Sequence, residues 1–361
     1  MVDFDALEAA GISNARERAA LIEYLDGVGF TADEMVEAEH RGRLFGLSGD
    51  ALQRSGRPIY TLREAADRLS VSADELGAAW HALGLSVADT DQPVFSQVDV
   101  DGLAAWVALK TAVGEDPTQT LLRVLGASMA RLAEAGSTAI RLGMPDIQME
   151  HSEDELTTAR AYRAVGEFIP RLAVLVDAVF RHHTVSARTY FEGVVRDTTA
   201  SVICGVGFAD LTGFTSLTQR LTPTELSELL VEFAGAVNDV VLADGGRIVK
   251  FIGDEVMWVS SNPEQLVKVA FDLVEHPGAR EAGLQVRAGL AYGQVLAIAG
   301  DYFGNPVNLA ARLAAAASPG QVLVSTDVRD ELAGWPATPQ EPLLLKGFDT
   351  PVTAYDLHVA R

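Results

Sequence analysis

The stretch RIVKFIGDEVMW, residues 247–258, decides the fold of the C-terminal half of this chain. Apolar and β-branched residues stand on both sides of a Gly-Asp pair, which is typical of a β-hairpin that turns at Gly253 and Asp254. Lys250 precedes Asp254 by four residues. The pattern predicts a strand that carries a lysine and a turn that carries a carboxylate, in a chain that already has 50 acidic residues.

Outward from this hairpin, short β-rich runs alternate with helical runs from about residue 201 onward. This order predicts an α+β domain in which helices pack against one sheet. The predicted elements are, in order, a strand at 201–210, a helix at 223–243, the hairpin at 247–260, a helix at 264–275, a second hairpin at 284–300, a helix at 305–317, a strand at 321–325 and a final pair of strands at 343–348 and 352–359.

The N-terminal part, residues 1–185, has a different texture and is predicted to be a mostly α-helical domain. Apolar residues recur there at spacings of three and four, as in 159–180, where we expect Pro170 to break the helix. A linker at 186–198 then leads to the α+β domain at 199–361.

Residues 60–85, YTLREAADRLSVSADELGAAWHALGL, resemble the helix-turn-helix that opens MerR-like DNA-binding domains. A helix that reads DNA needs basic or amide side chains. The segment 72–85 has no lysine or arginine and carries Asp74 and Glu75. We therefore interpret it as a degenerate helix-turn-helix used for packing, and expect no nucleic-acid partner.

The composition excludes several classes of protein. A formal net charge of −22 disfavours sequence-independent nucleic-acid binding and binding to anionic membranes. The single cysteine, Cys204, allows no disulfide within the chain, which fits a reducing compartment. The N-terminus lacks the pattern of a signal peptide, and no apolar run is long enough to span a bilayer. We predict a cytoplasmic protein.

Two carboxylates fall at predicted strand ends. Asp210 ends the first strand and precedes a turn into a helix, and Asp254 lies at the tip of the hairpin. Each one alone is typical of a helix cap or a turn residue. If the two elements are neighbours in the sheet, both carboxylates emerge at one edge and suit a divalent metal, with Mg²⁺ the default beside phosphate.

Further polar residues follow in GDYFGNPVNLAARL, residues 300–313. Asn308 and Arg312 are four residues apart on a predicted helix and so share one face, while the neighbouring leucines point into the core. Read in isolation, this face and Lys346 in LLLKGF are typical of a solvated surface.

As an ordered set, these motifs resemble the catalytic domain of class III adenylyl cyclases. The resemblance covers about 201–358 and rests on FADLTGFT, GGRIVKFIGDEVM, VRAGLAYGQV, DYFGNPVNLAARL and LLKGF. It implies a ferredoxin-like, palm-type catalytic domain preceded by a helical regulatory domain. Diguanylate cyclases, which have a GGDEF signature, share only Gly-Asp-Glu with this hairpin.

The resemblance also assigns roles to residues. It implies that Asp210 and Asp254 bind two metal ions per site, Mg²⁺ or Mn²⁺, with the Leu211 carbonyl as a further ligand. It implies that Lys250 and Asp301 recognise adenine. The other residues that it places at the substrate are Asn308 and Arg312 as catalytic groups, and Phe214, Thr215 and Lys346 as substrate contacts.

The implied activity is conversion of ATP to cyclic AMP and pyrophosphate, at sites shared across a symmetric homodimer. One chain would supply the metal aspartates and the other the adenine pair, the asparagine and the arginine. Two alternatives stay open: a catalytically silent nucleotide sensor, and a transcription regulator built on the helix-turn-helix.

We interpret the N-terminal half as a regulatory domain that controls how two catalytic domains meet, by autoinhibition or otherwise. Its input is a proton, sensed by His182 and His183, or a small or lipid effector. The histidines alone are equally typical of an exposed linker, and a constitutive dimerisation domain remains an alternative.

Overall fold

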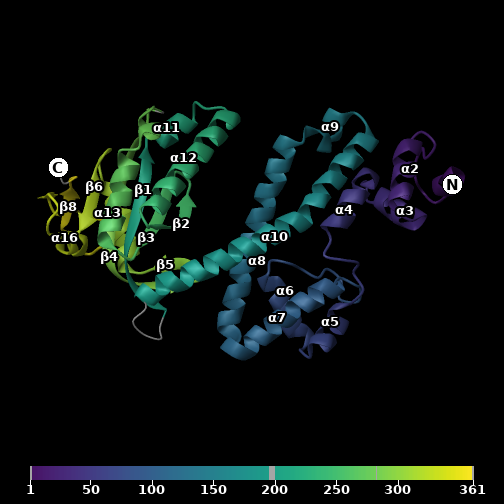
Figure 1. Cartoon of the computed structure of the whole chain (residues 1–361), viewed down its shortest axis with the longest axis horizontal. Coiled ribbons are helices and arrows are strands. Elements are labelled where there is room, and N and C mark those ends of the chain that lie inside the picture. Colours follow the sequence, from purple (N-terminus) through teal and green to yellow (C-terminus); the bar gives the residue numbers. More distant parts are fainter. Residues whose placement is uncertain (1, 195–199, 282, 360–361) are drawn as a thin grey trace. The chain divides into compact units, whose positions relative to one another are not determined.

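The computed structural model describes residues 2–194, 200–281 and 283–359 (Figure 1). The chain divides into two compact units, Met1–His182 and His183–Arg361. The division falls inside helix α10, Glu155–Val194, which therefore includes the first residues of the predicted linker. Residues 195–199 of that linker lie outside the described residues. No helix among the described residues is long and apolar enough to cross a membrane.

The prediction that Pro170 breaks a helix is wrong, because α10 continues through it. A proline removes one intrahelical hydrogen bond and crowds the preceding turn, at a cost of roughly 3 kcal/mol. The long helical segments on both sides of Pro170 outweigh that local cost.

The N-terminal unit is helical, as predicted. Its elements are α1 (Phe4–Ala9), α2 (Ala19–Val28), α3 (Ala32–His40), η1 (Leu44–Gly46), α4 (Leu47–Gln53), α5 (Leu62–Leu69), α6 (Ala73–Ala82), α7 (Gln97–Val113), α8 (Glu115–Gly143), η2 (Pro145–Ile147), α9 (Met149–Ser152) and the first part of α10. Buried side chains of α1 to α4 form one core, and those of α5 to α8 form a second one.

Helices α5 and α6 occupy the segment for which a helix-turn-helix is predicted. A capping box starts each of them, in α6 between Ser72 and Glu75. Lys110 donates a hydrogen bond of 2.7 Å to Glu75, and this bond together with those from Ser72 lowers the pKa of the Glu75 carboxyl to about 2. The acidic residue in the recognition position is thus engaged within its own unit.

The C-terminal unit contains a mixed sheet with the strand order β2-β3-β1-β4-β6-β8-β7, and β5 pairs with β4. The strands are β1 (Ser201–Thr212), β2 (Arg247–Ile252), β3 (Glu255–Ser260), β4 (Gln285–Ile298), β5 (Asp301–Phe303), β6 (Val322–Ser325), β7 (Ala337–Pro339) and β8 (Ala354–Leu357). The helices are α11 (Phe214–Thr218), α12 (Pro223–Ala243), α13 (Pro263–Val274), α14 (Pro277–Glu281), α15 (Asn305–Ala316) and α16 (Thr326–Glu331). The α+β class is confirmed.

Helices cover both faces of the sheet. Side chains of α12 and α13 pack on one face, and those of α15 pack on the other. Strand β1 alternates between them: Phe208 points to the α15 side, and Ala209 to the α12 side. A Cβ at Gly289 of β4 would overlap backbone atoms of α15, so only glycine lets this helix approach the sheet so closely.

Two predicted strand pairs differ in the structure. The stretch 284–300 is not a hairpin, because β4 runs without a turn and pairs with β1 from Gln285 to Leu296. Its true turn follows at Ala299 and Gly300 and leads into β5. The stretch 343–348 forms an isolated bridge, Leu343 to Val352, and the strand beside β8 is β7.

Candidate active site

The hairpin and β1 are neighbours, as the metal-site prediction required. Strand β3 pairs with β1, and Asp210 lies opposite Glu255 in that ladder. On its other side Asp210 lies opposite Arg287 of β4. Asp254 occupies the turn between β2 and β3, where Gly253 has a φ of 66°. The sheet therefore brings three carboxylates and one guanidinium to one edge.

Arg287 contacts Asp210 directly. Its Nε and Nη2 donate hydrogen bonds of 2.9 and 2.6 Å to the Oδ2 of Asp210. Its Nη1 donates to the carbonyl oxygens of Ala315 and Ala317, at 2.9 and 3.3 Å. One guanidinium thus fixes the Asp210 carboxylate against the C-terminal end of α15.

Burial, together with the nearby negative charge, raises the pKa of the other two carboxyls, Asp254 and Glu255. Burial raises the pKa of the Asp254 carboxyl, and the charge of Asp210 adds to the effect. Burial raises the pKa of Glu255 to about 7, with the charges of Asp210 and Asp254 as further causes. Carboxylates that repel one another in this way are stabilised by a cation.

The donor set fits a hard divalent cation that also binds phosphate. Within the described residues, no three carboxylate, imidazole or thiol groups are arranged to enclose a metal ion by themselves. Mg²⁺ is commonly bound by one or two carboxylates, and substrate phosphates and water complete its shell. Asp210, Asp254 and the Leu211 carbonyl at the edge of the sheet fit that mode. The Leu211 side chain itself is buried in the core on the α12 side.

The predicted base-recognition pair is in contact within one chain. Lys250 of β2 donates a hydrogen bond to the Oδ2 of Asp301 in β5. The other oxygen of Asp301 accepts a hydrogen bond of 2.8 Å from the backbone N–H of Tyr302. Both side chains are only partly buried, so the remaining N–H groups of the lysine and a lone pair of the carboxylate are open to a ligand.

The predicted catalytic helix face is present on α15. Asn308 and Arg312 are exposed, while Leu309 and Leu313 are buried. The Nε of Arg312 donates a hydrogen bond of 3.2 Å to the carbonyl oxygen of Lys346, whose side chain is exposed. The structure thus joins two of the predicted substrate residues across 34 positions of sequence.

The other predicted residues lie as follows. Phe214 begins α11 and is half-buried against the core on the α12 side. The side chain of Thr215 lies outside the described residues. His182 and His183 are exposed within α10, on either side of the division between the two units.

Sequence reasoning missed Arg287 and Glu255. Arg287 is part of the VRAGLAYGQV motif, and Glu255 follows Asp254, but the sequence alone assigns no role to either residue. Their importance comes from the register that places each of them opposite Asp210. The alternation of side chains along paired strands indicates which residues lie opposite Asp210 only when the register between the strands is known.

Two family models match the chain. The model of the adenylate and guanylate cyclase catalytic domain matches residues 198–359, and that of the adenylate cyclase regulatory domain matches residues 4–186. The chain belongs to the class III nucleotidyl cyclases. The resemblance stated from the motifs and the fold class implied by it are therefore confirmed, and the helical N-terminal unit corresponds to a regulatory region of this family.

Relatives cover most of this cyclase. It is 68% identical over 99% of its length to an uncharacterised protein of Mycobacterium tuberculosis (strain H37Rv), of which it covers 94%. It is 34% identical over 76% of its length to an adenylate cyclase of Streptomyces coelicolor, of which it covers 71%. It is 32% identical over 92% of its length to a pH-sensitive adenylate cyclase of M. tuberculosis (strain CDC 1551), of which it covers 84%.

Proposed function

We propose that this cyclase is an adenylyl cyclase, which converts ATP to cyclic AMP and pyrophosphate. The observation that carries the proposal is the contact between Lys250 and Asp301 in a chain that also has the carboxylates Asp210 and Asp254 at one sheet edge. A lysine can donate to adenine N1, and an aspartate can accept from the N6 amine. Guanine presents the reverse pattern, so the pair favours ATP. Relatives named adenylate cyclases support this choice.

Asp210 and Asp254, with the Leu211 carbonyl, would hold two ions of Mg²⁺ or Mn²⁺ in each site. Such ions lower the pKa of a bound hydroxyl and polarise a phosphoryl group. With such an ion on the Asp210 carboxylate, Arg287 would be free to donate to the phosphate oxygens of the substrate, for which its planar set of donors is well suited.

In the reaction, the ribose 3′-hydroxyl attacks the α-phosphorus and pyrophosphate leaves in line. Asn308 would orient the ribose, and Arg312 would donate to the α-phosphoryl oxygens as their charge grows. Such a donor is typically worth about 3–4 kcal/mol of the barrier. Lys346 would contact the triphosphate, and Phe214 and Thr215 the substrate beside the metal-binding turn.

The active form is a homodimer with two shared sites. In the described part of one chain, the metal carboxylates and the Lys250–Asp301 pair each have their own contacts, and no hydrogen bond joins the two sets. Large apolar side chains of the strands that carry or adjoin the pair are exposed: Phe251, Ile252, Leu296, Ile298 and Phe303. A surface of this kind next to polar site residues is typical of a protein interface. A symmetric dimer would complete both sites.

The N-terminal unit would regulate this dimer in signal transduction in the cytoplasm, including by autoinhibition. Helix α10 is continuous to Val194, and β1 begins at Ser201, so a movement of the helix is passed to the catalytic unit over a short segment. The candidate inputs are a proton at His182 and His183, or a small or lipid effector.

The test measures cyclic AMP and cyclic GMP made by the full chain from ATP or GTP, with Mg²⁺ or Mn²⁺. We expect cyclic AMP, its loss in Asp254→Ala, and its retention in Asp239→Ala, an exposed aspartate of α12. ATP binding without any cyclic nucleotide would favour the silent nucleotide sensor. Activity of Asp254→Ala equal to that of the unchanged protein would refute the metal assignment.

Shared sites have a further test. A dimer of one Asp254→Ala chain and one Arg312→Ala chain has one site with both defects and one site with none. Equal mixing makes half of the dimers mixed, so roughly a quarter of the unchanged activity should return. Two inactive variants that stay inactive when mixed, while still forming dimers, would argue against sites shared in this way.

A further inference from the structure

One tyrosine near the end of α10 contacts both strands that carry the predicted base-recognition pair. Tyr190 is half-buried and packs against the core on the α15 side of the sheet. The guanidinium of Arg247 lies over its ring, 5.7 Å from the ring centroid, and Arg247 begins β2, the strand of Lys250. The Tyr190 hydroxyl interacts with that of Tyr302 in β5, which follows Asp301. All of these residues belong to the C-terminal unit.

A β-bulge in β2 brings two cations of this strand to one face of the sheet. The register between β2 and β3 shifts at Val249, which is an extra residue in β2. Before the bulge, Arg247 lies opposite Val259. After it, Lys250 lies opposite Met257, and both of these β3 residues are buried in the core on the α15 side. In a regular strand, residues three positions apart point to opposite faces. The bulge therefore places both cations on the face where Tyr190 packs.

Tyr302 holds the acidic member of the pair. Its backbone N–H donates a hydrogen bond of 2.8 Å to Oδ1 of Asp301, while Lys250 donates to Oδ2 of the same carboxylate. Burial raises the pKa of the Tyr190 and Tyr302 hydroxyls, so both stay protonated at neutral pH. A displacement of the Tyr190 ring therefore reaches Asp301 through Tyr302, and it reaches Lys250 through Arg247.

We propose that Tyr190 is a positioning residue for base recognition, which sets the geometry of the Lys250–Asp301 pair from both of its sides. This inference deepens the proposed function and rests on its assignment of the pair to adenine. A donor and an acceptor discriminate between two bases only when their spacing matches one of them. Loss of the Tyr190 contacts should therefore weaken the preference for ATP over GTP. The metal carboxylates lie on other strands and should be unaffected.

The first experiment compares the steady-state kinetics of the full chain and of Tyr190→Phe, with ATP or GTP and Mn²⁺. Phenylalanine keeps a ring against Arg247 and the core, and removes the hydroxyl beside Tyr302. We expect the KM for ATP to rise roughly threefold to tenfold, the range that one hydrogen bond contributes, with kcat changed less than about twofold. The kcat/KM for GTP should not change. An unchanged ratio of the kcat/KM values for the two nucleotides would overturn the proposal.

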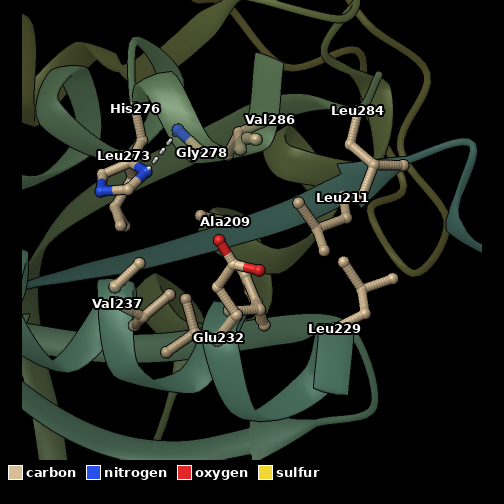
Figure 2. Close-up of a pocket in the computed structure, with 14 residues that line it drawn as sticks. Ala209, Leu211, Leu229, Glu232, Val237, Leu273, His276, Gly278, Leu284 and Val286 are labelled. Carbon is tan, nitrogen blue, oxygen red and sulfur yellow. Dashed lines mark hydrogen bonds between the residues drawn. The ribbon is translucent and has the colours of Figure 1, made fainter. Parts of the chain in front are cut away.

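Two further variants separate positioning from packing. Tyr355→Phe is the matched control, because Tyr355 is also half-buried in this sheet but packs on the opposite face, toward the core with Ala209 and Leu211 (Figure 2). It should leave the nucleotide preference unchanged. In a Tyr302→Phe background, Tyr190→Phe should have little further effect, because the contact between the hydroxyls is already lost. A loss of preference as large in that background as in the unchanged protein would refute the route through Tyr302.

A binding measurement keeps this inference apart from the proposed function. The nucleotides 3′-deoxy-ATP and 3′-deoxy-GTP lack the attacking hydroxyl, so they bind without reacting. Calorimetry on the full chain with Mn²⁺ should show weaker binding of 3′-deoxy-ATP to Tyr190→Phe, and no such change in Tyr355→Phe. This pattern in a chain that makes no cyclic nucleotide would overturn the proposed function and leave the positioning role established. Equal affinity of the unchanged protein for both analogues would overturn the assignment of the pair to adenine, and this inference with it.

Discussion

Replacing Arg287 by methionine tests whether the Arg287–Asp210 contact is the element that holds the carboxylate edge together. Methionine keeps most of the apolar stem of the side chain and removes every donor. The Asp210 carboxylate then faces Glu255 and Asp254 with no cation in contact, and the C-terminal end of α15 loses the bonds to Ala315 and Ala317.

The expected loss can be worked from these contacts. Two charge-assisted bonds reach Asp210, and fully buried bonds of this kind contribute about 1.5–3 kcal/mol each. The side chains are 25% and 20% exposed, and solvent screening reduces the pair to about 2–3 kcal/mol in total. The carbonyl bonds of α15 add about 1 kcal/mol each. We expect Arg287→Met to lower the free energy of unfolding by about 4 kcal/mol.

The assay is urea unfolding followed by tryptophan fluorescence, to which Trp258, fully buried in β3, contributes, for the single variants Arg287→Met and Asp210→Ala and the double variant. In the Asp210→Ala background, where the side chain of residue 210 has no acceptor, Arg287→Met should cost only about 2 kcal/mol, because only the bonds to α15 remain to be lost. Mn²⁺ should restore part of the loss in Arg287→Met, since a divalent cation takes over Asp210. An equal loss in both backgrounds, with no effect of Mn²⁺, would refute this reasoning.

Three further predictions concern the C-terminal unit. Burial raises the pKa of the Cys204 thiol to about 11, so at pH 8 about one thiol in a thousand is ionised. Iodoacetamide should therefore label the protein only in denaturant. Labelling of the native protein at the rate of a free thiol would contradict this prediction. Tyr190, near the end of α10, packs against the core that contains Cys204 and Tyr302; Tyr190→Ala should destabilise this unit by about 3 kcal/mol in urea titrations, and Tyr190→Phe by much less. Gly289→Ala would push the new Cβ into the α15 backbone and should lower both stability and cyclic AMP production. Gly235→Ala in α12, which has open space around it, should be neutral or stabilising by about 0.5–1 kcal/mol. Comparable unfolding curves for the two variants would contradict the close packing of α15.

Elements with strong local signals could be predicted from the sequence. The hairpin of β2 and β3 follows from two β-branched runs around Gly253 and Asp254, and its turn is observed there. Helix α12 begins at Pro223 behind a capping box, which is a local signal as well. For these elements the residues that form the structure are adjacent in sequence.

The wrong predictions concern elements whose structure depends on pairing with segments that are distant in the sequence. The sequence predicts a second hairpin at 284–300, a stretch that contains Gly293, whose φ is 151°. In the structure, pairing with β1 over twelve register positions keeps β4 extended. The same limit applies to the site. Asp210 and Asp254 could be predicted from strand ends, while the roles of Arg287 and Glu255 depend on a cross-strand register that no local pattern encodes.

The same strand also links the candidate active site to the core on the α12 side. In β1, Asp210 points to the edge with Arg287, and its neighbours Ala209 and Leu211 are buried in the core on the opposite face. Successive side chains of a strand alternate between its two faces, because its period is two residues. A substitution that displaces Ala209 or Leu211 therefore also moves the Cα of Asp210. Among the described residues, the Arg287 guanidinium contacts this carboxylate and is itself anchored to α15. A small shift of β1 thus changes the contact between Arg287 and Asp210, so the packing of the core on the α12 side affects the candidate active site without touching it.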